Sequence, residues 1–115
     1  MAGGFVYMMS NRRYGTLYVG VTSDLARRAW EHREGVVPGF TRTYALHRLV
    51  WYEAHSAIQG AIQREHNMKH WPRRWKTALV DDMNPGWEDL FGQLWGRLEV
   101  NPAWLPSIDG SADLN

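Results

Sequence analysis

The pattern of apolar residues begins with two runs that predict a β-hairpin. Residues 5–9 (FVYMM) and residues 16–21 (TLYVGV) are rich in β-forming side chains, and residues 10–15 between them are turn formers. Each run is apolar at consecutive positions, which is typical of a strand that is covered on both faces. Helices are therefore expected on both sides of the predicted sheet.

Further along the chain, helical patterns alternate with one more strand. Residues 46–53 predict a third strand, whereas residues 35–44 are expected to form a loop. Four helices are predicted: from an N-cap at Ser23 and Asp24 to Gly35, from a capping box at Ser56 and Gln59 to about Lys69, from Pro72 to about Val80, and over residues 87–98. This order predicts an α+β fold with a small three-stranded antiparallel sheet flanked by helices, built as a ββαβα core plus C-terminal helices.

Length and composition bound the domain organisation. The chain has 115 residues, of which 44% are hydrophobic and 7 are Trp, so we expect a single domain over residues 1–100. Residues 101–115 are mostly polar and contain Pro and Gly, which predicts a loosely ordered tail. Because the chain has no Cys, no apolar run of about 20 residues and no signal-peptide pattern, we expect no disulfide, no membrane span and a cytoplasmic location.

The net charge of +1 conceals an uneven distribution. Residues 1–80 hold 12 Lys+Arg and 5 Asp+Glu, a formal charge of +7, whereas residues 81–115 hold 1 and 7, a formal charge of −6. A basic body favours contact with a polyanion such as DNA, and a solvated charge pattern is the alternative. The candidate contacts to a nucleic-acid backbone are Arg12, Arg13, Arg42, Arg73, Arg74 and Lys76.

The first predicted helix carries two polar side chains on one face. Arg28 and His32 are one helical turn apart, while Leu25 and Ala29 form the inward face. A cation and an imidazole held together can engage a phosphate, or they can be two solvated side chains. Both interpretations are open from the sequence of this helix alone.

The second predicted helix places a carboxylate among apolar residues. Glu65 lies on a stripe at helical spacing, whose members are Ile58, Ala61, Ile62 and Met68. A carboxylate in such a place needs a partner, because an unpaired buried charge is costly. Three partners are open: a divalent cation, a core arginine, or Lys69 one turn further along the helix.

Two tyrosines of the predicted hairpin complete the candidate residues. Tyr7 and Tyr18 are expected to face each other across the two strands, where tyrosine is common for packing reasons as well. Taken alone, the pair is compatible with a packing role or a catalytic one.

Together these segments resemble the GIY-YIG nuclease superfamily. Residues 6–7 (VY), residues 18–20 (YVG) after a short turn, and residues 25–32 with Arg28 and His32 look like its core. Residues 64–71 (REHNMKHW) resemble the segment that carries the superfamily's metal-binding glutamate. The similarity covers about residues 5–92, and its last part resembles the small stand-alone bacterial members.

The resemblance implies a role for each matched residue. Tyr7 and Tyr18 would line the active site, Arg28 would contact the scissile phosphate, and His32 matches a position that is His or Tyr in many members. Tyr7 is the expected base, either because Arg28 or the metal ion favours its phenolate form or because His32 draws the proton onward. Glu65 would be the sole carboxylate ligand of one Mg²⁺ or Mn²⁺ ion. The further expected substrate contacts are Gly20, Arg27, Arg42, Lys69 and Asn84.

The function that the resemblance implies is a divalent-metal-dependent DNA endonuclease of DNA repair, recombination or restriction, acting as a monomer or a homodimer. One alternative is a DNA-binding module without catalysis. Another is a protein-interaction domain that presents Trp87 and Trp95. The intact set of Tyr7, Tyr18, Arg28 and Glu65 favours the enzyme, because a lapsed nuclease need not retain all of them.

Overall fold

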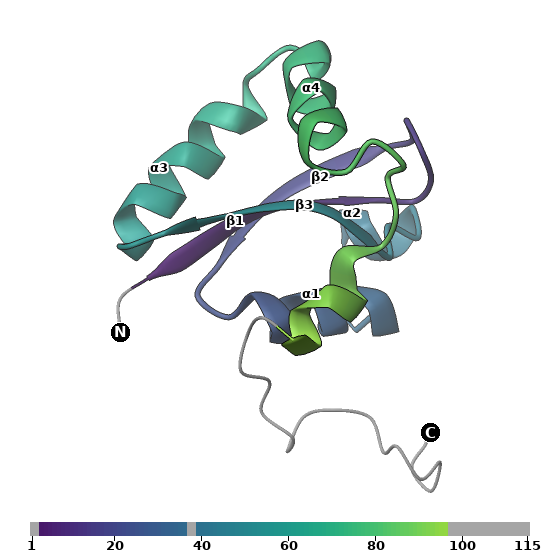
Figure 1. Cartoon of the computed structure of the whole chain (residues 1–115), viewed down its shortest axis with the longest axis horizontal. Coiled ribbons are helices and arrows are strands. Elements are labelled where there is room, and N and C mark those ends of the chain that lie inside the picture. Colours follow the sequence, from purple (N-terminus) through teal and green to yellow (C-terminus); the bar gives the residue numbers. More distant parts are fainter. Residues whose placement is uncertain (1–2, 37–38, 97–115) are drawn as a thin grey trace, which may run out of the picture.

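The fold is a three-stranded antiparallel sheet with helices on both faces, as the sequence predicts. The computed structural model describes residues 3–36 and 39–96, so the predicted tail at 101–115 and the predicted domain end at residue 100 lie outside the described residues. The elements are β1 (Gly4–Ser10), β2 (Leu17–Thr22), α1 (Leu25–Glu34), α2 (Phe40–Thr43), β3 (Arg48–His55), α3 (Ile58–Lys69), α4 (Arg73–Met83) and the 3-10 helix η1 (Leu90–Gly96) (Figure 1).

β1 is the central strand of the sheet. The strand order is β2-β1-β3, and β1 pairs antiparallel with both neighbours. Its register with β3 shifts between Met8 and Met9, where β3 carries one extra residue, Val50. Because β1 is central, its side chains on both faces are buried, which explains the continuous apolar run at its positions in the sequence.

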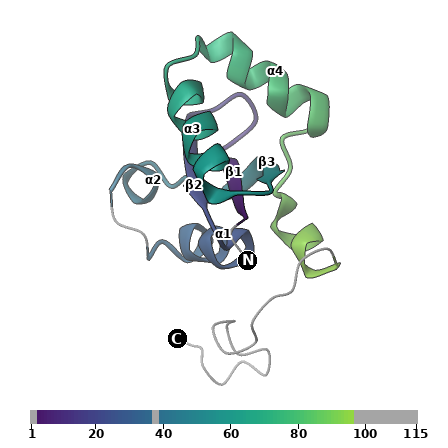
Figure 2. The ribbon, with the colours of Figure 1, turned by 90° about the vertical axis from the view of Figure 1, so that its left-hand side faces the viewer.

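Two hydrophobic cores lie on opposite faces of the sheet. In Figures 1 and 2, α3 and α4 lie on one side of the strands, while α1 and η1 lie on the other. The first core contains Val6, Met8, Val19, Val50, Trp51, Ala61, Met68, Val80 and Trp87. The second contains Tyr7, Met9, Leu25, Ala26, Ala29, Leu46, Leu49, Leu90 and Leu94. The even-numbered side chains of β1 thus face α3, and the odd-numbered ones face α1.

The caps of α1 follow the prediction. The Asp24 carboxylate accepts a hydrogen bond from the Arg27 backbone N–H at 3.2 Å, and Gly35 ends the helix in the left-handed region at φ 72°. The Thr22 hydroxyl accepts a hydrogen bond from the Asp24 N–H at 3.0 Å, which fixes the turn from β2 into α1. These contacts set the direction in which α1 presents its polar side chains.

Four local predictions were wrong. α3 begins at Ile58 after an Ala57 N-cap without a side-chain hydrogen bond, so the Ser56 capping box does not form. The predicted loop contains the short helix α2, and the last predicted helix is a 3-10 helix. Ile62, predicted to face the core, is 50% exposed, because α3 packs on the sheet through Ala61 and Met68.

Trp87 is not part of the predicted protein-interaction surface, because it does not lie at the surface. The Trp87 side chain is fully buried in the core between the sheet and α4, and its indole N–H donates to Asp81 at 2.8 Å. The other proposed member, Trp95, has a side chain that lies outside the description. Trp87 therefore stabilises the fold and is not available to a partner.

Candidate active site

The candidate site includes Tyr7 on β1 and Gly20 on the neighbouring strand β2. In the register of the hairpin Tyr7 lies opposite Gly20, and Tyr18 lies opposite Met9. The prediction that the two tyrosines face each other directly was therefore wrong, although they share one face of the sheet with ring centroids 6.3 Å apart. A Cβ on Gly20 would lie 2.4 Å from the Tyr7 hydroxyl oxygen, so glycine is needed for the Tyr7 ring to lie over β2. The structure thus gives Gly20 a packing role.

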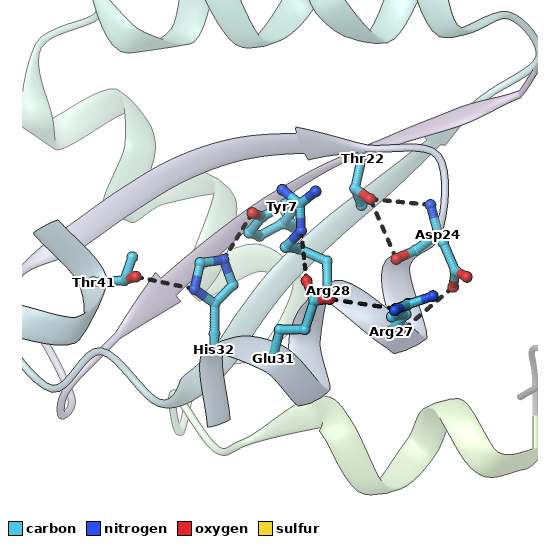
Figure 3. Close-up of polar contacts among 8 residues, drawn as sticks. All are labelled: Tyr7, Thr22, Asp24, Arg27, Arg28, Glu31, His32 and Thr41. Carbon is cyan, nitrogen blue, oxygen red and sulfur yellow. Dashed lines mark hydrogen bonds and ion pairs between the residues drawn. The ribbon is translucent and has the colours of Figure 1, made fainter. Parts of the chain in front are cut away.

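His32 lies between Tyr7 and a residue that the sequence did not single out, Thr41. A hydrogen bond of 2.9 Å joins the Tyr7 hydroxyl to His32 Nε2, and one of 3.1 Å joins His32 Nδ1 to the Thr41 hydroxyl (Figure 3). All three side chains are buried. We call Thr41, His32 and Tyr7 the inner chain.

Burial sets the protonation states of the inner chain. It lowers the pKa of His32 to about 4, with a further contribution from the positive charge of Arg28. Burial, followed by the neighbouring Tyr18, raises the pKa of the Tyr7 hydroxyl well above its ordinary value. At neutral pH the proton therefore stays on Tyr7, and His32 is a neutral imidazole that can accept a hydrogen bond.

Arg28 and Arg27 are neighbours on α1 with different surroundings. The Arg28 side chain is 39% exposed, pairs with Glu31 at 3.2 Å and faces the Tyr7 hydroxyl (Figure 3). Burial opposes its charge, but Tyr7 and Glu31 outweigh burial and raise its pKa. Arg27 is 54% exposed and pairs with the same Glu31 at 3.3 Å. Only Arg28 is in contact with the inner chain, which agrees with its selection over Arg27 from the sequence.

A pocket lies beside Arg28 at the start of α1. It has a volume of about 380 Å³, and its lining is Thr22, Ser23, Asp24, Arg27, Arg28 and Glu31. Both guanidinium groups border this space, which suits an anion better than an apolar ligand. The pocket therefore opens the Arg28 side of the site to solvent.

Glu65 and Lys69 reach the site from α3. Their side chains form an ion pair of 2.5 Å, and the Lys69 ammonium lies 5.8 Å from the Tyr18 ring centroid. Glu65 is 13% exposed and Lys69 is 47% exposed. Of the partners left open by the sequence, Lys69 is the one observed. We call Tyr18, Lys69 and Glu65 the outer rim, which lies at the edge strand β2.

Glu65 is the residue that fits a divalent cation. Within residues 3–36 and 39–96 there is no group of three or more His, Cys, Asp or Glu side chains that could hold a metal ion. A magnesium ion nevertheless needs only one or two carboxylates when it keeps waters and takes phosphate oxygens from a substrate. The Lys69 ammonium pairs with this carboxylate from one helical turn away, so a metal ion would have to displace it. One weakly held ion therefore fits the donor set.

The remaining predicted contacts lie in different environments. Arg42 is exposed on α2, next to Thr41. The Asn84 side chain is buried, where it donates to the carbonyls of Val50 and Glu88 and accepts from the Glu88 N–H. Its polar atoms are thus engaged in joining β3 to the segment after α4, which gives Asn84 a structural role in place of the predicted substrate contact.

Thr41 is the residue that the sequence analysis missed. It lies in a segment rich in Pro, Gly and Thr that predicts a loop, and a lone threonine there has no distinguishing pattern. Only its distance to His32 reveals it.

None of the described helices is long and apolar enough to cross a membrane.

Comparison with known proteins identifies the family. Residues 3–78 match the GIY-YIG catalytic domain, and they include Tyr7, Tyr18, Arg28, His32 and Glu65. A UPF0213 protein of Natronomonas pharaonis is 37% identical over 81 residues, which are 70% of this chain and 94% of that protein. A UPF0213 protein of Bacillus pumilus is 32% identical over 69 residues, which are 60% of this chain and 70% of that protein.

A solved structure is also similar to the chain. The solution NMR structure of a UPF0213 protein from Bacillus halodurans shares 33% identity and covers 69% of this chain and 83% of that chain, with a TM-score of 0.43. The match to the catalytic domain spans more than half of the 115 residues and includes both tyrosines, the arginine and the glutamate of the candidate site. The chain therefore belongs to the GIY-YIG nuclease family.

Proposed function

We propose that this protein is a divalent-metal-dependent endonuclease that hydrolyses phosphodiester bonds of DNA. The observation that carries the proposal is the convergence of two sets of residues around the Tyr7 and Tyr18 rings. The inner chain and Arg28 come from β1, α1 and α2, and the outer rim adds a carboxylate and an ammonium group from α3. A phosphate placed between them meets a cation, a proton acceptor and a metal-binding carboxylate.

Arg28 is the proposed contact to the scissile phosphate. Its guanidinium is always charged and presents a planar fork that matches two phosphate oxygens. The Arg28 guanidinium faces the Tyr7 hydroxyl and pairs with Glu31. It also borders the pocket at the start of α1, where a phosphate can approach it. Negative charge that develops on the phosphorus-bound oxygens during attack of water is stabilised there.

The inner chain is the proposed acceptor of the water proton. As the water oxygen bonds to phosphorus, its proton passes to the Tyr7 oxygen while the Tyr7 proton passes to His32 Nε2 over the 2.9 Å hydrogen bond. No free phenolate is needed, so the raised pKa of Tyr7 is not an obstacle. The bond from phosphorus to the leaving nucleotide breaks, and the leaving oxygen takes a proton from solvent.

Binding of the phosphate also prepares His32 for this role. The charge of Arg28 is the second cause that keeps the pKa of His32 low. The singly charged phosphodiester on Arg28 offsets that charge, and the pKa of His32 rises in response. The imidazole thus becomes a better proton acceptor when substrate is present.

Glu65 is the proposed ligand of one Mg²⁺ or Mn²⁺ ion, which when bound supplies Lewis-acid stabilisation of the leaving oxygen. GIY-YIG nucleases generally use divalent metal ions, in agreement with this assignment. Lys69 releases Glu65 for that purpose and offers its ammonium to the substrate backbone. Because the protein offers one carboxylate, the ion is expected to bind more tightly with DNA than without it.

The DNA backbone is proposed to follow exposed cations away from the site. Arg73 donates to the carbonyls of Tyr14 and Gly15, so the start of α4 lies against the hairpin loop. This contact places the cations of the hairpin loop near those at the start of α4. The proposed contacts are the exposed Arg12, Arg13, Arg42 and Arg74 and the half-buried Lys76. Because the proposed substrate is DNA, the proposed location of the protein is the cytoplasm.

Incubation with labelled DNA tests the proposal. Duplex, branched, nicked and single-stranded DNA are each incubated with the protein and Mg²⁺, Mn²⁺ or chelator. We expect cutting that chelator stops and that Arg28→Ala and Glu65→Ala abolish, whereas Arg33→Ala, a control on the same helix whose side chain pairs with Asp89, retains it. Full activity of Glu65→Ala would overturn the metal assignment. Salt-dependent binding without cutting of any substrate would make the protein a DNA-binding module.

A further inference from the structure

The geometry points to Thr41 as a positioning residue that fixes which nitrogen of His32 carries the proton. The role rests on the proposed function, because it concerns the same inner chain. Neither the family match nor the sequence pattern assigns a role to this threonine. Its place on the short helix α2, outside the hairpin and the long helices, distinguishes it from the residues that carry the resemblance.

The ring of His32 is held at both nitrogens. Nε2 lies 2.9 Å from the Tyr7 hydroxyl, and Nδ1 lies 3.1 Å from the Thr41 hydroxyl (Figure 3). His32 and Thr41 are both buried, so water does not compete for either nitrogen. A neutral imidazole has one N–H and one lone pair, and the hydrogen bond at one nitrogen decides the state of the other.

The neighbours of Tyr7 decide between the two forms. The Arg28 guanidinium faces the Tyr7 oxygen, and a guanidinium has only donors, so it offers no acceptor for the Tyr7 hydrogen. Among the described residues, His32 Nε2 is the only hydrogen-bond acceptor in contact with the buried Tyr7 hydroxyl, so we infer that Tyr7 donates to Nε2, because the opposite direction would leave its hydrogen without an acceptor. Nε2 therefore carries the lone pair, Nδ1 carries the proton, and the Thr41 hydroxyl accepts from it.

This form is the one that the proposed reaction requires. When Tyr7 receives a proton from water, it passes its own proton to Nε2, and His32 becomes an imidazolium whose two N–H groups face Tyr7 and Thr41. In the opposite form Nε2 already carries a proton and cannot accept another. Thr41 would thus act through His32 and would not touch the substrate.

Backbone hydrogen bonds hold Thr41 in place. Its carbonyl accepts from the Leu46 N–H at 2.8 Å, and the Thr43 N–H donates to the Gly39 carbonyl at 2.9 Å across the same turn. Leu46 belongs to the core that contains Tyr7 and the inward face of α1, so α2 is anchored to that core. These backbone hydrogen bonds therefore hold Thr41 at a position from which its hydroxyl reaches His32 Nδ1.

The test compares Thr41→Val, which keeps the shape and removes the hydroxyl, with Thr41→Ser, which keeps the hydroxyl. The nitrogen-15 chemical shifts of His32 in the full chain without DNA report the tautomer directly. We expect the Nδ1–H form in the unsubstituted protein and in Thr41→Ser, and a shift toward the Nε2–H form in Thr41→Val. Single-turnover cleavage is expected to fall about 10–100-fold in Thr41→Val and to return in Thr41→Ser.

The outcomes separate this role from the proposed function. An Nε2–H form in the unsubstituted protein, or an unchanged tautomer and rate in Thr41→Val, would overturn it. The exposed Thr43→Val on the same helix is the control and is expected to change neither reading. Thr41→Ala replaces Thr41→Val if the latter does not fold. If the unsubstituted protein cuts no DNA, the proposed function fails, while the tautomer measurement still decides the role of Thr41.

Discussion

The inner chain and the outer rim meet at the same pair of tyrosine rings but are built differently. Thr41, His32 and Tyr7 are buried and joined by hydrogen bonds of 2.9 and 3.1 Å. In the outer rim, Lys69 is 47% exposed and shares one ion pair with Glu65. Burial moves the pKa values of Tyr7 and His32 far from their ordinary values, whereas the rim is open to solvent at Lys69.

The difference follows from the elements that carry each set. The inner chain joins the central strand β1 to α1 and α2 through hydrogen bonds, and its Tyr7 belongs to the hydrophobic core on that face of the sheet. The rim is formed where α3 reaches the edge strand β2, so solvent is close. A site that must bind a long polyanion and an ion needs an adaptable edge, and a proton acceptor needs fixed geometry. Substitutions in the two sets should therefore have different signatures.

Among substitutions that keep the charge of a side chain, the largest effect is expected at Arg28, which links the inner chain to solvent. Arg28→Lys keeps the charge but loses the planar fork, and we expect cleavage to fall about 10²–10³-fold. Arg27→Lys is the matched control, because Arg27 pairs with the same Glu31 but does not contact Tyr7. Its expected loss is below about threefold. Single-turnover rates of both variants are the measurement, and equal losses would contradict the assignment of Arg28.

The second effect concerns stability and pH. The pKa of His32 is about 4 in the folded protein, against 6.5 as its ordinary value, so the unfolded chain binds more protons between these values. The free energy of unfolding should fall as pH falls through this window, by on the order of 3 kcal/mol from this group. Urea unfolding of the unsubstituted protein and of His32→Gln checks it. The variant should lose less stability over the same range, and parallel curves would argue against a buried neutral His32.

A third effect tests the packing beneath the inner chain. Gly20→Ala places a methyl group where 2.4 Å separates it from the Tyr7 hydroxyl, and we expect a loss of about 1–3 kcal/mol in the free energy of unfolding. Gly92→Ala is the control, because no atom lies within 4 Å of its added Cβ. Its change should be within about 0.5 kcal/mol. Equal costs at both positions would mean that the Tyr7 ring is not fixed against β2.

The smallest effect is expected in the rim. Lys69→Gln removes a half-exposed ion pair, so the free energy of unfolding should change by less than about 1 kcal/mol. The logarithmic salt dependence of DNA binding should become shallower by about one if Lys69 contacts a phosphate. Fluorescence anisotropy over a salt series measures it. An unchanged slope would mean that Lys69 pairs with Glu65 but contacts no DNA phosphate.

The sequence predicted the sheet and the residues on regular elements well. Strands with apolar side chains at every position, the Asp24 cap and the Gly35 terminus are local signals, and each is confirmed. Helical spacing placed Arg28 and His32 on one face. The glutamate on the apolar stripe was found as well, although its observed partner is Lys69.

The parts that the sequence did not predict depend on contacts between distant segments. Thr41 acquires its place only because α2 packs against α1, and no spacing rule links it to His32. Asn84 was matched to a substrate contact, but its surroundings in the folded chain use its amide to join β3 to the following segment. The register of the hairpin, which sets Tyr7 opposite Gly20, also depends on the turn and not on the apolar pattern.

The most direct measurement compares Tyr7→Phe with Tyr18→Phe in single-turnover DNA cleavage at saturating protein, with DNA binding measured in parallel. Each substitution removes one hydroxyl and keeps the ring that packs on the sheet. If the inner chain accepts the proton of the attacking water, Tyr7→Phe should bind DNA normally and cut about 10²–10⁴-fold more slowly, while Tyr18→Phe should lose about tenfold or less. The account would be contradicted by a Tyr7→Phe variant that cuts at the unsubstituted rate while Tyr18→Phe does not cut.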